Sequence, residues 1–127
     1  MYTVFIHEDA AKDLDEFWKT DPDVAARLVV LLEECENNQD LLDRLTQHKF
    51  NDSDINISRW LALWNRDKNI WRLKLWDLER KGMQYRVIYA FIPTKKQYHF
   101  LAIAPRDFNY DPNHELTKRI IRAYKEL

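Results

Sequence analysis

Five side chains in the second half of the sequence could bind phosphate and stabilise charge on it. Four are cations within or at the end of strand-like runs, and the fifth is a tyrosine in the loop that follows. Guanidinium groups bind phosphate oxygens in bidentate geometry, and cations held at sheet positions are preorganised for an anion. These residues therefore predict a surface that binds a polyanion such as nucleic acid. They are Arg72, Lys74, Arg86, Arg106 and Tyr110.

The chemistry that suits these side chains is RNA cleavage by the RNA's own 2′-hydroxyl. The set contains neither the carboxylate nor the histidine base that most hydrolases use, but this reaction needs mainly alignment, charge stabilisation and proton exchange. Arginine keeps its proton and can only stabilise charge. Lys74 or Tyr110 could act as acid or base if neighbouring cations depress its pKa. In the alternative interpretation, the strand cations only solubilise an exposed sheet face and Tyr110 caps the sheet edge.

Charge is divided unequally along the chain. Residues 1–58 contain 14 Asp/Glu and 5 Lys/Arg, a net charge of −9, whereas residues 59–127 contain 7 and 15, a net charge of +8, so that the whole chain carries −1. We expect the acidic residues to lie on the solvated outer faces of the N-terminal helices. RNA would then contact only the basic half, through long-range attraction and phosphate contacts.

Several kinds of site are not expected. Cys35 is the only cysteine, so no internal disulfide can form, and its position on an apolar helix face predicts a buried structural thiol in a reducing cytoplasm. Gly82 is the only glycine, which argues against a glycine-rich phosphate loop. The four histidines lack metal-ligand spacing. We therefore expect no metal and no cofactor. No apolar run approaches the roughly 20 residues of a membrane span, so we expect no membrane partner.

The elements that must position these residues can be assigned from periodicity and turn signals. The length of 127 residues and the apolar content of 46% predict one domain with a substantial core. Asp21 followed by Pro22 is a helix start signal, and the alternation of apolar and cationic residues from Ile70 predicts consecutive antiparallel strands. The predicted elements are a strand over 2–7, a helix ending near residue 18, a helix from 21 to about 38, strands over 70–76, 85–93 and 98–104, and a helix over 116–127.

The segment over 39–66 follows no single period. Leucines near its start suggest a helical turn, residues 51–54 read as a loop, and Ile57, Trp60, Leu61 and Trp64 fall at near-helical spacing. We expect both tryptophans to pack under the sheet. The order of elements predicts an α+β fold with an antiparallel or mixed four-stranded sheet, an N-terminal helical pair and a C-terminal helix, with the helices on one sheet face.

The strand motifs and their order resemble the RelE/ParE superfamily of toxins from bacterial type II toxin–antitoxin systems. The resemblance is carried by residues 71–75 (WRLKL), 85–90 (YRVIYA) and 101–106 (LAIAPR), together with the helix over 118–127. It implies a RelE-like β-α-α-β-β-β-α fold over a single domain, residues 1–127. The connection over about 41–69 is longer than is usual in that family.

The RelE/HigB-like branch implies a metal-independent endoribonuclease, or mRNA interferase, that inhibits translation by cleaving mRNA in the ribosomal decoding site. A cognate antitoxin protein would silence it. By position, Arg72 and Lys74 match the basic pair of the family's second strand, Arg86 the arginine of the third strand, and Arg106 the arginine that ends the fourth. Tyr110 matches a late aromatic residue near the scissile phosphate.

Three alternatives stay open within this resemblance. His114 could take the role of Tyr110, because the family varies in spacing and identity at that point. The same fold also hosts ParE-like inhibitors of DNA gyrase, as well as modules that bind a protein and catalyse nothing. The four cations favour the nuclease branch, because a gyrase inhibitor would have no need of them.

Overall fold

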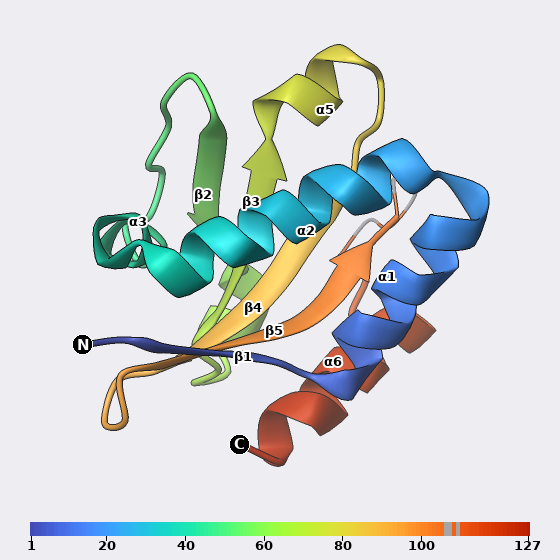
Figure 1. Ribbon diagram of the computed structural model, residues 1–127. Helices are drawn as coiled ribbons and strands as arrows, with labels where there is room; N and C mark the ends of the chain where they lie inside the picture. Colours follow the sequence, from blue (N-terminus) through green and yellow to red (C-terminus); the bar gives the residue numbers. More distant parts are fainter. Residues whose placement is uncertain (106–107, 109) are drawn as a thin grey trace.

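The computed structural model describes residues 1–105, 108 and 110–127 and has the α+β fold that the sequence predicts (Figure 1). The predicted strands and helices are all present in the expected order, and short additional elements lie between them. The order is β1 (Thr3–Ile6), α1 (Glu8–Thr20), α2 (Pro22–Asn37), α3 (Gln39–Arg44), β2 (Ile55–Arg59), α4 (Leu61–Trp64), β3 (Ile70–Leu75), α5 (Trp76–Arg80), β4 (Arg86–Ile92), β5 (Gln97–Ala104) and α6 (Glu115–Lys125).

The sheet has five strands, in the order β1-β5-β4-β3-β2, and not the four that the sequence predicted. β1 runs parallel to β5, and the other neighbours are antiparallel, so the predicted β3-β4-β5 meander is confirmed. The additional strand is β2, in which Ile57 pairs with Leu73 of β3. Its alternation of Ile55 and Ile57 with polar residues is typical of a strand, but the tryptophans that follow gave the segment a helical spacing.

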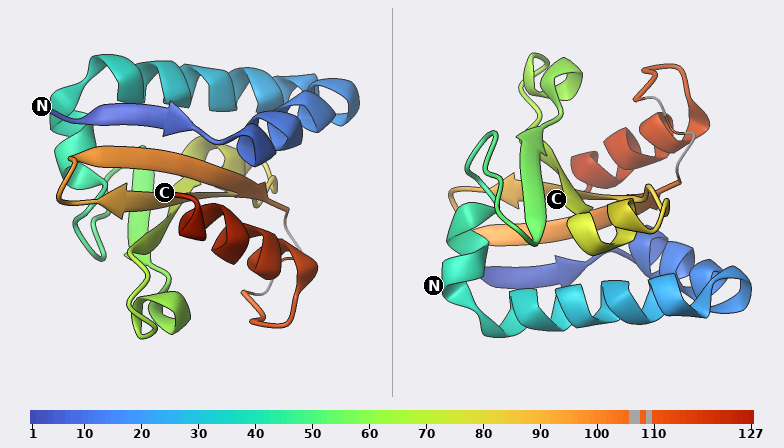
Figure 2. Two further views of the ribbon diagram at one scale, coloured as in Figure 1. Left: turned by 90° about the horizontal axis from the view of Figure 1, so that it is seen from below. Right: turned by 90° about the horizontal axis from the view of Figure 1, so that it is seen from above.

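Helices cover both faces of the sheet, so the prediction that they share one face is wrong (Figure 2). One core packs α2 and α3 against residues such as Leu73 and Tyr89, and the other packs α4 and α6 against Ile88 and Ala102. The buried apolar side of α6 includes Leu116, as the sequence predicted. A helical stripe does not reveal which sheet face it will cover, because both faces of a central strand can be apolar.

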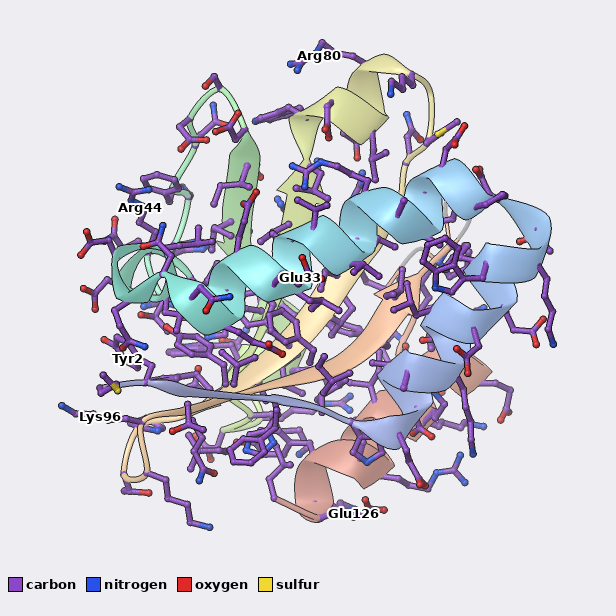
Figure 3. The ribbon with its side chains drawn as sticks, viewed as in Figure 1. Tyr2, Glu33, Arg44, Arg80, Lys96 and Glu126 are labelled. Atoms are coloured by element: carbon purple, nitrogen blue, oxygen red, sulfur yellow. The ribbon has the colours of Figure 1, made fainter. Side chains whose placement is uncertain are left out.

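The N-terminal helices form the acidic outer layer that the charge division predicts. The Asp21 carboxylate accepts a hydrogen bond from the Val24 backbone N–H and caps α2, with Pro22 in the first turn. Figure 3 shows Glu33 on the solvent side of α2, where it is exposed. Cys35 lies on the opposite side of the helix, fully buried, and burial raises the pKa of its thiol to about 12. Cys35 is therefore a structural residue, as predicted.

The connection between α2 and β3 is part of the core. Tyr98 and Tyr89 lie buried in the sheet and donate hydroxyl hydrogen bonds to the backbone carbonyls of Leu42 (2.5 Å) and Leu45 (2.7 Å). Trp60 is buried, and Trp64 packs edge-on against Trp71 with a ring separation of 5.6 Å, so both tryptophans pack against the core as predicted. Among the described residues, none of the helices combines the length and apolar character that crossing a membrane requires.

Candidate active site

Three of the predicted cations meet on one face of the sheet. Arg72 pairs with Ile88 across β3 and β4, and paired residues point to the same face, which is the face that α6 partly covers. Leu73 pairs with Val87, so Lys74 and Arg86 lie one position further along the two strands. All three cations are half-buried, not freely solvated. We call this group, Arg72, Lys74 and Arg86, the cationic cluster.

Arg72 is held in place by the strand that the sequence did not predict. Its Nη1 donates to the side-chain oxygen of Asn56 on β2 at 2.5 Å and to the Asn56 backbone carbonyl at 3.3 Å. The Asn56 amide in turn donates to Asn51 Oδ1 at 3.3 Å, and Trp76 Nε1 donates to the same oxygen at 2.8 Å. Burial, and secondarily repulsion from Arg86, lowers the pKa of Arg72. An arginine still remains charged, so Arg72 is a positioned and permanent cation.

Arg86 forms an ion pair with Glu79 of α5, and this places a carboxylate in the candidate site. The exposed fractions of the two side chains are 17% and 13%, so the pair is well shielded from solvent. Arg86 Nη1 also donates to the Tyr85 carbonyl at 3.1 Å. The five predicted residues contain no carboxylate, and Glu79 is an addition to that set. Glu79 carried no usable signal in the sequence, because α5 folds back toward β4 only in three dimensions.

Lys74 is the titratable cation of the cluster. Burial is the main cause that lowers the pKa of its ammonium group, and repulsion from Arg72 and Arg86 lowers it further, while Glu79 acts in the opposite direction. Lys74 forms no ion pair within the described part of the chain. A lysine with a lowered pKa loses its proton more readily than an ordinary lysine, which is the direction that a general base requires.

Tyr110 reaches the same region from the loop after β5. Its ring packs against Trp60 and Phe108, each at a centroid distance of 5.1 Å, and its φ of 56° lies in the left-handed region that a bulky residue rarely adopts. Its hydroxyl is buried, and Arg86 lies close enough to interact with it. Burial raises the pKa of Tyr110, although the nearby Arg86 and Arg72 oppose this effect. The phenol therefore keeps its proton and has it available to donate.

Of the other two candidates, only His114 can be placed. Arg106 lies outside the described residues. His114 instead caps α6, because its Nδ1 accepts a hydrogen bond from the Leu116 backbone N–H at 3.0 Å and its ring packs against Phe108 at 5.2 Å. A histidine used in this way holds the start of a helix, so the structure gives His114 a structural role.

His48 is a neighbour of the cluster that was not predicted from the sequence. Its Nδ1 accepts a hydrogen bond from the Arg59 backbone N–H at 3.1 Å. Its pKa is lowered by burial and then by the charges of Arg59, Lys49 and Arg72. Asn56 was missed as well, although the alternation over residues 55–59 could have revealed the strand that carries it.

No protein-family model, curated protein or solved structure matches this chain. Function must therefore be argued from the site, because fold alone does not determine it. The site combines two shielded arginines, a lysine whose pKa is lowered and a phenol whose pKa is raised. Together these groups can bind a phosphodiester, stabilise added negative charge and exchange protons at two of its oxygens.

Proposed function

We propose that this chain is an mRNA endoribonuclease of the RelE/ParE type, the toxin of a type II toxin–antitoxin system, that inhibits translation at the ribosome. The observation that carries the proposal is the meeting of Arg72, Lys74, Arg86 and Tyr110 at one part of the sheet, from three separate segments of the chain. Residues that only solubilise a surface would be exposed, whereas these four are all half-buried. Charge held in such an environment acts strongly on a bound phosphate.

The proposed reaction is an internal transesterification. The 2′-oxygen of one nucleotide forms a bond to the adjacent phosphorus, and the bond from phosphorus to the 5′-oxygen of the next nucleotide breaks. The products are a 2′,3′-cyclic phosphate and a 5′-hydroxyl. Arg72 and Arg86 stabilise the charge that builds on the non-bridging oxygens, which is the task that a metal ion performs in other nucleases.

Lys74 and Tyr110 divide the proton transfers. Neutral Lys74 accepts the proton of the 2′-hydroxyl, because its lowered pKa makes the unprotonated amine accessible. Tyr110, whose pKa is raised by burial, donates its hydroxyl proton to the departing 5′-oxygen. Glu79 holds the Arg86 guanidinium in place until the phosphate binds. The opposite shifts of two neighbouring pKa values are the usual arrangement for an acid and a base.

The charge distribution supports two partners for this activity. The basic half would contact mRNA and ribosomal RNA, while the acidic α1–α2 layer faces away. A cognate antitoxin with an acidic segment would neutralise the cationic cluster and associate in a salt-sensitive manner. Co-expression with the small open reading frames next to this gene should therefore restore growth to cells that the chain inhibits.

Translating ribosomes provide the direct test. Purified protein should generate new mRNA ends inside coding regions, with 5′-hydroxyl and 2′,3′-cyclic phosphate termini. Arg72→Ala should lower the cleavage rate roughly a hundredfold, the typical effect of losing one preorganised charge donor. The matched control is Arg66→Ala, which removes an exposed arginine outside the cluster.

Three results would contradict the proposal. Inhibition of gyrase supercoiling without RNA cleavage would assign the chain to the ParE-like branch. Cleavage that persists unchanged in a folded Arg72→Ala protein would remove the cationic cluster from the mechanism. Growth inhibition that needs neither activity would favour a module that only binds a protein.

A further inference from the structure

An apolar groove opens directly beside the cationic cluster. It lies where β2 leads into α4, and its volume is about 300 Å³, at the lower end of the usual size for small-ligand sites. Arg72 and Tyr110 belong both to its wall and to the candidate active site, so the two sites are continuous. The groove is lined by Arg59, Trp60, Leu61, Ala62, Arg72 and Tyr110. We call it the α4 groove.

The walls of the α4 groove are aromatic and fixed in position. The Trp60 ring is 4% exposed and stands nearly perpendicular to both Tyr110, at an angle of 81°, and Phe108, at 78°. Leu61 contributes an apolar side chain that is 55% exposed, an unusual burial state for leucine. A rigid apolar slot of this kind can accept a flat ring with little loss of conformational entropy.

Arg59 also lines the groove, and its guanidinium is fixed against two tryptophans beside it. Its guanidinium lies 4.2 Å from the centre of the Trp64 ring and 5.4 Å from that of Trp71. Its Nε is buried without a hydrogen-bond partner among the described residues.

We propose that the α4 groove binds one nucleobase of single-stranded RNA, next to the phosphate held by the cationic cluster. The apolar walls match the flat base, and Arg59 and Arg72 match the negative charge of the adjoining backbone. Paired bases are stacked inside a duplex and would not reach the groove, so the site selects unpaired RNA. The inference rests on the proposed function for the identity of its ligand, but it concerns binding and not cleavage.

A non-cleavable ligand isolates this binding step. The probe is a short single-stranded RNA with 2′-O-methyl groups, which cannot undergo the transesterification, and binding is followed by fluorescence anisotropy and by tryptophan quenching. An otherwise identical probe lacking one base at successive positions reports the contribution of each base. We expect one abasic position to weaken binding roughly tenfold, because stacking of one base on an aromatic side chain contributes about that much.

Two substitutions at exposed positions test the groove itself. Ala62→Phe should fill it, weaken binding of the intact probe roughly tenfold and abolish the difference between the intact and the abasic probe. Asn65→Phe is the matched control, because Asn65 is exposed at the end of the same helix but does not line the groove. Leu61→Ser removes part of the wall and should weaken binding less. Thermal unfolding confirms that each variant is folded.

The outcomes separate this inference from the proposed function. If folded Ala62→Phe binds both probes as the parent does, or if duplex RNA binds as tightly as the single strand, the α4 groove is not a base site, even where cleavage by the parent is normal. If the groove variants and the abasic probe behave as expected while the parent leaves translated mRNA intact, the base site stands and the nuclease assignment is wrong.

Discussion

Two shielded arginine–carboxylate pairs join separate elements of this chain, and they differ in what surrounds them. Arg119 of α6 binds Asp13 of α1, with exposed fractions of 28% and 17%, and Arg86 of β4 binds Glu79 of α5, with exposed fractions of 17% and 13%. Burial alone therefore does not distinguish them. Their neighbours do.

The Asp13 carboxylate of the Asp13–Arg119 pair is well supplied with hydrogen-bond donors, whereas Arg119 Nε makes no hydrogen bond to a described residue. Asp13 accepts two hydrogen bonds from Arg119, at 2.9 and 2.6 Å, and a third from the Ile103 backbone N–H at 2.9 Å. A second carboxylate, Asp9, lies 3.9 Å from Arg119 Nε. Negative charge here exceeds positive charge. The contact joins α1, β5 and α6 and offers nothing to an anionic ligand.

The Glu79–Arg86 pair lies among like charges. Arg72 and Lys74 are close enough for their pKa values to be lowered by the other cations of the cluster; Glu79 opposes this effect on both, and Tyr110 and Tyr89 oppose it on Arg72. Among the described residues of the cluster, positive charge exceeds negative charge in a half-buried setting. Like charges held close together lower the stability of the protein unless an anion binds to them. Such clusters are typical of functional sites. An ion pair becomes part of a binding site when its surroundings leave net charge uncompensated.

The largest effect is expected from Lys74→Met, which keeps the length of the side chain but removes the base. Cleavage should fall roughly a hundredfold or more, the usual contribution of a general base. Lys12→Met is the control, because Lys12 is exposed on α1. Both variants should unfold at nearly the same urea concentration as the parent. Equal cleavage by the two folded variants would refute the role of Lys74.

The pH profile sharpens the same prediction. The reactive form of Lys74 is the neutral amine, and its pKa lies below the ordinary lysine value. The cleavage rate should therefore rise with pH and level off below the pH at which an ordinary lysine would lose its proton. Lys74→Met should lack this rising limb. Single-turnover rates measured across pH on pre-formed complexes provide the test, and a rising limb that survives in the variant would assign the base to another group.

Breaking the Asp13–Arg119 pair should lower the stability of the protein and leave its cleavage activity unchanged. Arg119→Ala leaves the Asp13 carboxylate shielded and unpaired, and we expect the free energy of unfolding to fall by about 2 kcal/mol, less than for a fully buried pair because both groups retain some solvent contact. Cleavage per folded molecule should stay unchanged. Urea unfolding and an activity assay corrected for the folded fraction measure the two effects. If folded Arg119→Ala protein loses cleavage activity, the Asp13–Arg119 pair also contributes to activity, and the proposed difference between the two pairs is wrong.

A matched pair of amide substitutions compares the two carboxylates directly. Glu79→Gln should lower cleavage about tenfold, because Arg86 loses a charged hydrogen-bond partner, but should strengthen binding of non-cleavable RNA, because one negative charge leaves the cluster. Asp13→Asn should change neither quantity and should lower stability. Weaker RNA binding by Glu79→Gln would show that Glu79 contributes more to binding than its charge predicts.

The smallest effect is expected at the support of Arg72. Asn56→Ala removes the hydrogen bond that orients the guanidinium, and cleavage should fall about threefold, the net contribution of one such bond. Ser58→Ala, on the same strand, should have no effect on cleavage. Kinetics under single-turnover conditions resolve this difference, and equal rates for the two variants would show that Arg72 needs no support from β2.

Much of the fold could be predicted because its signals are local. Asp21 and Pro22 marked the start of α2, and alternation assigned β3, β4 and β5 and placed Arg72 and Lys74 on one face of their strand. β2 was missed because its apolar pair is short and is followed by tryptophans at helical spacing. The charge division also predicted the acidic outer layer of α2 correctly.

The sequence by itself determined which side of each element is apolar and which cations share a strand face, since these properties depend on periods of 3.6 and 2 residues. Only the tertiary structure decided that α6 covers the sheet face opposite α2, that α5 returns Glu79 to Arg86, and that Trp60 and Tyr110 enclose a groove beside Arg72. The position of α6 and the groove depend on residues far apart in the chain, and the Glu79–Arg86 pair depends on the turn that follows α5. Such contacts form because whole surfaces fit together when the elements pack. The periodicity of the sequence does not show which surfaces will meet.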